Sequence, residues 1–156
     1  LINRKENGEI KVITGIRRCG KSYLLFNLYY NYLLQNGVDK DCIIRIALDS
    51  PEWEDMLNIQ MLNEYIKSKI VPEKMNYIFL DEATNSLDAT NEYEIVDKLS
   101  EFYSGRTVVV VAHRMSTIRN ADQIIVMKHG RIVEVGTHDT LLANHAYYYE
   151  LVKSQI

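Results

Sequence analysis

Eight consecutive residues, from Gly15 to Ser22, carry the clearest chemical signal in this sequence. They read GIRRCGKS and fit the pattern G-x-x-x-x-G-K-[ST], which is typical of a phosphate-binding loop. The two glycines allow backbone N–H groups to curl around phosphate oxygens, and a following helix offers its partially positive N-terminus to the same anion. We expect Lys21 to reach the terminal phosphates and the Ser22 hydroxyl group to bind Mg²⁺.

The whole loop and the residue that follows it are candidates for binding the phosphorylated ligand: Gly15, Ile16, Arg17, Arg18, Cys19, Gly20, Lys21, Ser22 and Tyr23. Two interpretations of Arg17 and Arg18 remain open, namely contact with phosphate and simple exposure to solvent. Cys19 occupies a variable position of the motif, so no chemical role is needed to explain it.

Two carboxylates follow a short apolar segment further along the chain. YIFL, residues 77–80, predicts a strand that is buried on both faces, and Asp81 and Glu82 come directly after it. Open α/β sheets bind ligands at this end of their strands. We therefore expect Asp81 to hold Mg²⁺ together with Ser22, and Glu82 to orient or deprotonate an attacking water molecule.

His113 follows TVVVVA, residues 107–112, which predicts another central strand. An imidazole there can donate a hydrogen bond to a terminal phosphate and stabilise charge in the transition state. The alternative is a histidine that only bonds the backbone, and the other two motifs favour the first interpretation. Lys21, Glu82 and His113 are thus the candidate catalytic residues. The remaining histidines are expected to be structural: His129, His138 and His145.

The elements that must position these residues alternate between strand and helix signals, which predicts a parallel sheet covered by helices. The four predicted parallel strands are residues 9–16, 42–49, 77–80 and 107–112. The predicted helices cover residues 23–34, closed by Asn36 and Gly37, then a segment from an N-cap at 50–52 to Pro72, and residues 93–103.

The last quarter of the chain has a different pattern. QIIVMK and RIVEV flank His129-Gly130, which predicts a β-hairpin. After it, Thr137 is expected to cap a helical tail that extends to Val152.

The composition predicts one domain, residues 1–156, because a chain of this length with 47% apolar residues can bury a substantial core. Lys and Arg number 18 against 21 Asp and Glu, a net charge of -3, so a nucleic-acid partner is not expected. No stretch approaches the roughly 20 apolar residues of a membrane span, and we expect no direct insertion into a membrane.

Cellular location and completeness are also suggested by the sequence. The two cysteines lack metal-ligand spacing, which favours free thiols in a reducing cytoplasm. The chain opens at Leu1 without a signal segment, which predicts a fragment.

From Asp81 onward, the sequence DEATNSLDATNEYEIVDKLSEFYSGRTVVVVAHRMST and its continuation resemble the C-terminal half of an exporter-type ABC transporter nucleotide-binding domain. The resemblance implies that Asp81 and Glu82 end the Walker B strand, with Glu82 as the catalytic carboxylate. It also implies that Ser86-Leu87-Asp88 is the D-loop and that His113 is the switch histidine.

Residues 1–80 resemble a different family, the prokaryotic AAA+ ATPases with a GxRRxGKS loop. The two resemblances meet near residues 77–83, and we infer a chimera made by recombination or by design. Both imply the three-layer P-loop NTPase fold, with the strand at 107–112 lying between the strand before the loop and the strand before Asp81.

Several family features have no counterpart in this sequence. Between Ser22 and Asp81 there is no LSGGQ-like signature, glutamine-bearing loop or helical insert, which disfavours a role as a membrane transporter subunit. No arginine finger is recognisable either, and such a finger is worth about 10³ to 10⁵ in rate.

The expected function is binding of ATP with Mg²⁺, followed by slow hydrolysis to ADP and phosphate. ATP is preferred over GTP because of the two resemblances and because the guanine-reading N-K-x-D motif is absent. Two alternatives remain: a folded chimeric or designed module without significant catalysis, and the ATP-binding subunit of an ABC-type transporter. A homodimer is also left open.

Overall fold

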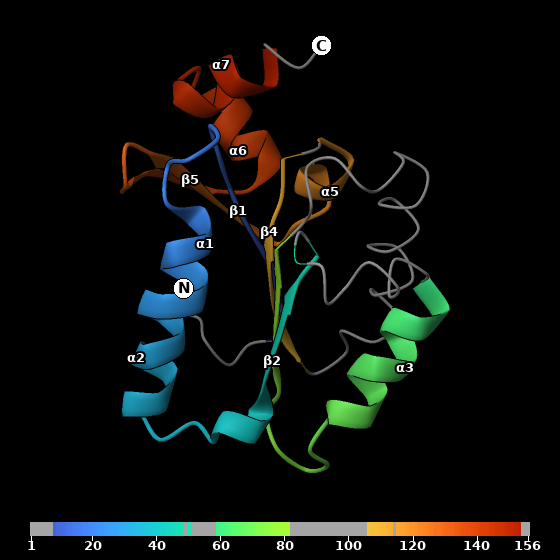
Figure 1. Cartoon of the computed structure of the whole chain (residues 1–156). Coiled ribbons are helices and arrows are strands. Elements are labelled where there is room, and N and C mark those ends of the chain that lie inside the picture. Colours follow the sequence, from blue (N-terminus) through green and yellow to red (C-terminus); the bar gives the residue numbers. More distant parts are fainter. Residues whose placement is uncertain (1–7, 49, 51–58, 82–105, 114, 154–156) are drawn as a thin grey trace.

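The computed structural model describes residues 8–48, 50, 59–81, 106–113 and 115–153. Within these ranges, six strands form one sheet in the order β2-β3-β4-β1-β5-β6 (Figure 1). Neighbouring strands are parallel except for the antiparallel pair β5 and β6. The strands are β1 (Ile10–Gly15), β2 (Ile43–Ala47), β3 (Tyr77–Asp81), β4 (Thr107–Val111), β5 (Gln123–Lys128) and β6 (Arg131–Gly136).

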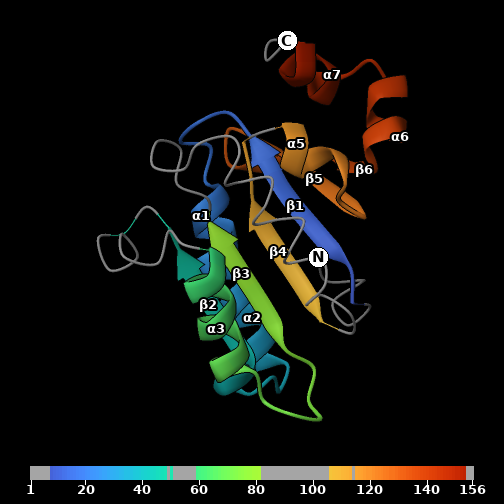
Figure 2. The ribbon, with the colours of Figure 1, turned by 90° about the vertical axis from the view of Figure 1, so that its right-hand side faces the viewer.

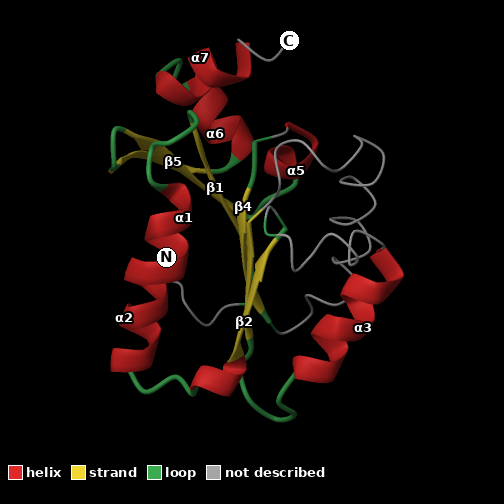
Figure 3. Cartoon of the chain, in the orientation of Figure 1, coloured by secondary structure: helices red, strands yellow, loops and turns green. Residues whose placement is uncertain are grey.

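Helices lie on both faces of this sheet and give the fold three layers. Figure 1 shows α1 and α2 on one face and α3 and α5 on the other, and the turned view of Figure 2 places α3 in front of the sheet. Figure 3 shows the same layers by element type. The helices are α1 (Lys21–Tyr23), η2 (Leu24–Tyr29), α2 (Tyr30–Gln35), η3 (Lys40–Cys42), α3 (Ile59–Lys69), α5 (Met115–Arg119), α6 (His138–Ala143) and α7 (Tyr147–Lys153).

This architecture confirms the predicted α/β class, the mainly parallel sheet and the C-terminal hairpin. It also confirms that β4 lies between β1 and β3. The five residues of β3 and the five of β4 are all buried, as expected for continuous apolar segments in the centre of a parallel sheet.

Two hydrophobic clusters hold the layers together, one on each face of the sheet. Side chains alternate between the faces of a strand, so Val108 and Val110 of β4 belong to one cluster and Val109 and Val111 to the other. Each fully buried valine of this kind contributes about 1.5–3 kcal/mol.

The helical stretch after the phosphate-loop motif runs without interruption from Lys21 to Gln35, and so begins two residues earlier than the sequence predicts. Its middle part, η2, is π-helical, and the Tyr30 N–H donates a hydrogen bond to the Leu25 carbonyl, five residues earlier. The stretch ends at Asn36, and Gly37 has φ +83°, as predicted. Its buried hydrophobic residues belong to the second cluster: Leu25, Tyr29 and Leu33.

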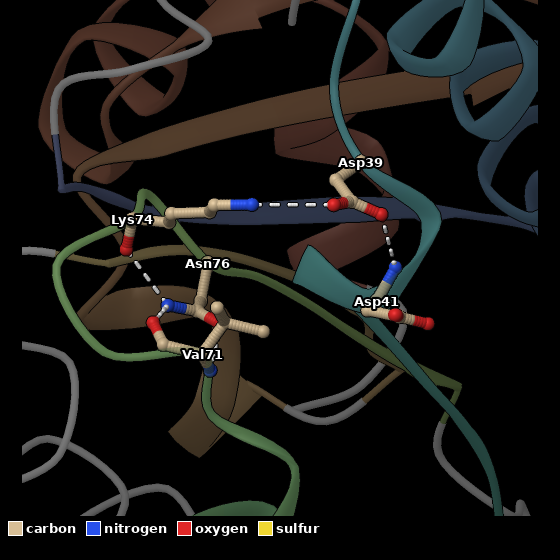
Figure 4. A network of polar contacts seen from close by, with 5 residues as sticks. All are labelled: Asp39, Asp41, Val71, Lys74 and Asn76. Carbon is tan, nitrogen blue, oxygen red and sulfur yellow. Dashed lines mark hydrogen bonds and ion pairs between the residues drawn. The ribbon is translucent and has the colours of Figure 1, made fainter.

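A polar network fixes the turn before β3, at the end of the sheet opposite the phosphate-loop motif (Figure 4). The buried Asn76 side chain accepts a hydrogen bond from the Val71 N–H and donates to the carbonyls of Val71 and Lys74, at 2.8–2.9 Å. Lys74 also pairs with Asp39 at 3.2 Å, and Asp39 accepts from the Asp41 N–H. The exposed ion pair contributes little, so Asn76 is the structural centre of this network.

The C-terminal region confirms the hairpin and corrects the helical tail. His129 and Gly130 both have positive φ, +49° and +75°, as a two-residue hairpin turn requires. Thr137 caps α6 in a capping box with its N3 residue, as predicted. The tail is two helices rather than one. His145 adopts φ +50° and its N–H donates a hydrogen bond to the Leu142 carbonyl, and this turn separates α6 from α7.

Several predicted features lie outside the described residues: Glu82, the segment 86–88, the helix at 93–103, and Pro51 and Glu52 of the predicted N-cap. The helix α5 was not predicted. Among the helices that the structure describes, none has the length and apolar character needed to cross a bilayer.

Candidate functional site

A cavity of about 460 Å³ opens at the carboxyl ends of β1, β3 and β4. The cavity is lined by Arg17, Arg18, Cys19, Gly20, Lys21, Ser22, Tyr23, Asp81, Val111 and His113. All of these except Val111 are candidate site residues in the sequence. Of the other predicted site residues, Gly15 and Ile16 do not line the cavity, and Glu82 lies outside the described residues.

The parallel pairing of three adjacent strands brings these distant segments together. In the register of the sheet, Ile13 of β1 pairs with Val111 of β4, and Val111 pairs with Asp81 of β3. The carboxyl ends of these three strands therefore lie at the same edge of the sheet. The loop follows β1, Asp81 ends β3 and His113 follows β4, which is why residues from three parts of the sequence border one cavity.

The loop leaves β1 through a glycine that no other residue can replace without strain. Gly15 has φ +147°, and a Cβ atom there would overlap the backbone oxygen of Met127 in β5 and lie 3.1 Å from the Cys19 Sγ. Gly20, just before α1, has φ +91° but more open surroundings, with Gly130 Cα the nearest atom at 3.9 Å. The two motif glycines thus serve different needs: close approach at Gly15 and backbone conformation at Gly20.

The Lys21 side chain lies inside the curve of the loop. It is 5% exposed, and its Nζ donates hydrogen bonds to the carbonyl of Gly15 at 3.1 Å and that of Ile16 at 2.8 Å. Burial lowers the pKa of Lys21 from its usual value, and the nearby Cys19 and Asp81 act in the opposite direction. The two carbonyls partly replace water around the ammonium group and hold it at the wall of the cavity.

The cavity is rich in positive charge. Among the residues that the structure describes, three cations line it, Arg17, Arg18 and Lys21, against one carboxylate, Asp81. The two arginines are exposed and Asp81 is buried. A polyanion is therefore the ligand that the electrostatics of this cavity favour.

The donor chemistry of the site fits Mg²⁺. Ser22 and Asp81 border the same cavity, and they offer a hydroxyl and a carboxylate oxygen. Oxygen ligands of this kind suit Mg²⁺, which commonly takes one or two ligands from a protein and the rest from water and phosphate.

His113 lies half-buried beside the cations. Burial, together with the positive charges of Lys21 and Arg17, lowers the pKa of His113 from 6.5 to about 4, and burial is the largest cause. The imidazole is therefore neutral at pH 7, with one N–H group available as a hydrogen-bond donor.

The β5–β6 hairpin supports the loop from behind, a contact that sequence reasoning missed. The Gly130 N–H at the hairpin turn donates to the Cys19 carbonyl at 3.2 Å, and the Met127 carbonyl of β5 lies against Gly15. Arg18, between these two contacts, has φ +61°, which a residue other than glycine adopts only at some cost. These contacts use backbone atoms, so no residue type signals them in the sequence.

Comparison with known families agrees with this geometry. The family model described as an AAA domain matches residues 7–135, which include the loop, Asp81 and His113. The chain belongs to the AAA domain family. The matched range also extends across the predicted junction at residues 77–83.

Half of this AAA domain also has ABC transporter homologues. It is 53% identical over 78 residues to the ATP-dependent lipid A-core flippase of Syntrophus aciditrophicus, a match that covers 50% of the chain and 13% of the flippase. It is 54% identical over 78 residues to the uncharacterized ABC transporter ATP-binding protein YknV of Bacillus subtilis, with the same coverage. For the multidrug resistance protein pgp-1 of Caenorhabditis elegans, the identity is 50% and the coverage of that protein is 6%.

A solved structure shows the same fold over most of the chain. The bacterial Atm1-family ABC exporter with ATP bound superimposes with a TM-score of 0.68 and 19% sequence identity, covering 95% of this chain and 37% of the exporter chain. The AAA domain thus has the fold of an exporter nucleotide-binding region, while it spans only 6–13% of the length of the curated relatives named above.

The two motif glycines should respond differently to alanine. Gly20→Ala should destabilise the fold by about 1–2 kcal/mol, the usual cost of a left-handed conformation. Gly15→Ala should cost more, because its Cβ atom also meets the Met127 carbonyl. Urea unfolding of both variants measures the difference, and equal losses of stability would show that β5 does not confine the loop at Gly15.

The pKa of His113 makes stability depend on pH. Its pKa of about 4 in the folded chain lies below the ordinary 6.5, so the unfolded chain binds more protons between these pH values. The stabilisation is complete above pH 6.5 and is lost as the pH falls toward 4. As the pH is lowered through this window, the free energy of unfolding should therefore fall more steeply for the unsubstituted protein than for His113→Gln. An equal fall in both proteins would show that the pKa of His113 is not lowered in the folded chain.

Proposed function

We propose that this AAA domain binds ATP together with Mg²⁺ in the cavity at the carboxyl edge of the sheet. The observation that carries the proposal is the buried Lys21 ammonium, held by the carbonyls of Gly15 and Ile16 on the wall of a cavity that also contains Ser22 and Asp81. An enclosed cation beside two oxygen ligands is the arrangement that a metal-bound polyphosphate requires. The names of the relatives, ATP-dependent and ATP-binding, support ATP as the nucleotide.

Each residue has a distinct part in this proposal. The backbone N–H groups of the loop and the start of α1 surround the phosphates, and the Lys21 Nζ turns from the loop carbonyls toward a phosphate oxygen. Ser22 and Asp81 are the residues that would hold Mg²⁺, which supplies charge neutralisation to the phosphates when bound. Arg17 and Arg18, both exposed at the cavity, attract the anion from solvent.

His113 is proposed as the group that responds to the terminal phosphate. Its imidazole is neutral because of burial and its cationic neighbours. A bound polyanion offsets those positive charges and raises the pKa of His113. The histidine then donates a stronger hydrogen bond to the phosphate as negative charge develops on its oxygens.

Hydrolysis is proposed to be slow. Glu82, which follows Asp81 directly in the sequence, is assigned the role of orienting or deprotonating the water that attacks the terminal phosphate. Lys21 stabilises the charge that develops on the phosphate oxygens. No arginine finger is recognisable in the sequence, and supplying one accelerates related enzymes by about 10³ to 10⁵, so we expect turnover far below that of a fully equipped ATPase.

We also propose that the chain is a single domain, residues 1–156, with a family junction near 77–83. Half of the chain is 53% identical to an ABC transporter protein, and an AAA domain model matches residues 7–135. This double similarity supports the proposal. Such an origin favours a second candidate function: a folded nucleotide-binding module without significant catalysis.

The first experiment compares nucleotide affinity of the unsubstituted protein with that of Lys21→Ala and Lys21→Met by isothermal titration calorimetry with ATP and Mg²⁺. Loss of a charge-assisted hydrogen bond of about 1.5–3 kcal/mol should weaken binding by about ten- to a hundredfold. Lys153→Ala, at the exposed end of α7, is the matched control and should bind normally. Equal affinity in the Lys21 variants would contradict the proposed site.

The second experiment separates slow hydrolysis from binding alone. Steady-state phosphate release is measured for the unsubstituted protein and for Glu82→Gln, which removes the base but preserves the size of the side chain. The proposal predicts that release falls while ATP affinity is retained. If both proteins release phosphate at the same rate, the release does not come from this site. The domain would then be better described as a nucleotide-binding module without significant catalysis.

A further inference from the structure

The base of the nucleotide also needs a surface, and one aromatic side chain on the cavity is placed to provide it. Tyr23 lies in the first helical turn after the loop and lines the same cavity as Lys21, Ser22 and Asp81. Because Lys21 and Tyr23 are two residues apart and border one cavity, a ligand whose phosphates lie at Lys21 has its remaining part within reach of the Tyr23 ring.

The Tyr23 ring is conspicuously exposed for a large aromatic side chain. It is 61% exposed, the highest value among the large hydrophobic residues that the structure describes. Packing therefore does not explain the residue, since neither hydrophobic cluster includes it. An exposed aromatic face at the mouth of a polyanion site gives a nucleobase a surface to stack on. The other ring that lines the cavity, the His113 imidazole, is half-buried beside Lys21 and Arg17.

The other tyrosines near this end of the molecule have their rings engaged. The Lys128 ammonium lies 4.3 Å from the ring centroid of Tyr147, Tyr149 contacts the His145 ring at 4.6 Å, and Tyr148 is buried. Within the part of the chain that the structure describes, neither a ring nor a cation contacts the face of Tyr23. Its face is therefore available for stacking beside the cavity.

We infer that the Tyr23 ring is the surface on which the nucleobase stacks, so that the site distinguishes a nucleoside polyphosphate from inorganic polyphosphate. This inference rests on the proposed function of the same cavity. Stacking uses the π-face that every base presents, so the contact selects for a base rather than for adenine in particular. ATP and GTP gain from it alike.

The test measures affinity for three ligands, ATP, GTP and inorganic tripolyphosphate, each with Mg²⁺, by isothermal titration calorimetry. Removing a stacking partner typically weakens base binding by about fivefold to a hundredfold, so Tyr23→Ala should lose that much affinity for ATP and GTP and none for tripolyphosphate. Tyr23→Phe keeps the ring and should bind like the unsubstituted protein. Leu28→Ala, 54% exposed on η2 and away from the cavity lining, should change neither affinity.

The outcomes separate this inference from the function on which it rests. If the unsubstituted protein binds both ligands and Tyr23→Ala weakens both equally or neither, the stacking role is refuted and the phosphate site stands. If the unsubstituted protein binds neither ligand, the proposed function fails and the inference fails with it.

A second readout does not depend on affinity. Tyr23→Trp places an indole at the same position, and its fluorescence should change on addition of ATP but not of tripolyphosphate. The unsubstituted protein, which contains a single tryptophan, Trp53, gives the background signal. An equal response to both ligands would overturn the inference.

Discussion

The site depends on one unusual placement, a lysine ammonium enclosed by the loop that precedes it. Lys21 is almost fully buried, and its Nζ is held by the carbonyls of Gly15 and Ile16. Enclosure costs hydration and lowers the pKa of Lys21, yet it fixes a positive charge next to the start of a helix and next to Asp81. An incoming polyanion therefore meets a positive charge at the wall of the cavity, and in the proposed complex the Lys21 Nζ only has to turn from the loop carbonyls toward the phosphate.

Backbone contacts with the neighbouring hairpin help to hold the loop in this shape. Gly15 passes so close to β5 that a side chain would overlap the Met127 carbonyl, and the hairpin turn holds the Cys19 carbonyl through Gly130. The hairpin therefore contributes to the site without contributing a residue to the cavity. Tertiary support of this kind keeps the loop curved while the exposed arginines remain available to a ligand.

The sequence predicted the parts of the fold that depend on local chemistry. Continuous apolar segments marked the buried strands β3 and β4, and the glycine-rich loop between a strand and a helix marked the site that Asp81 and His113 complete. The placement of β4 between β1 and β3 came from family resemblance, since the residue pattern alone does not specify which strands are neighbours.

The features that the sequence did not predict depend on tertiary context. Neither the π-helical segment η2 nor the break at His145 has a residue signal in the sequence, since histidine carries no strong helix-ending signal of its own. The support of the loop by the hairpin uses backbone atoms of segments more than a hundred residues apart. Glu82 remains a prediction, because it lies outside the described residues.

The central claim is that polyphosphate occupies the curve of the loop around Lys21. Amide chemical-shift changes on titration with ATP and Mg²⁺ locate the ligand residue by residue in the intact protein. The account predicts the largest changes at residues 16–23, with further changes at Asp81 and His113. Changes concentrated elsewhere, such as on the exposed strand β6, with an unaltered Lys21 amide would contradict it.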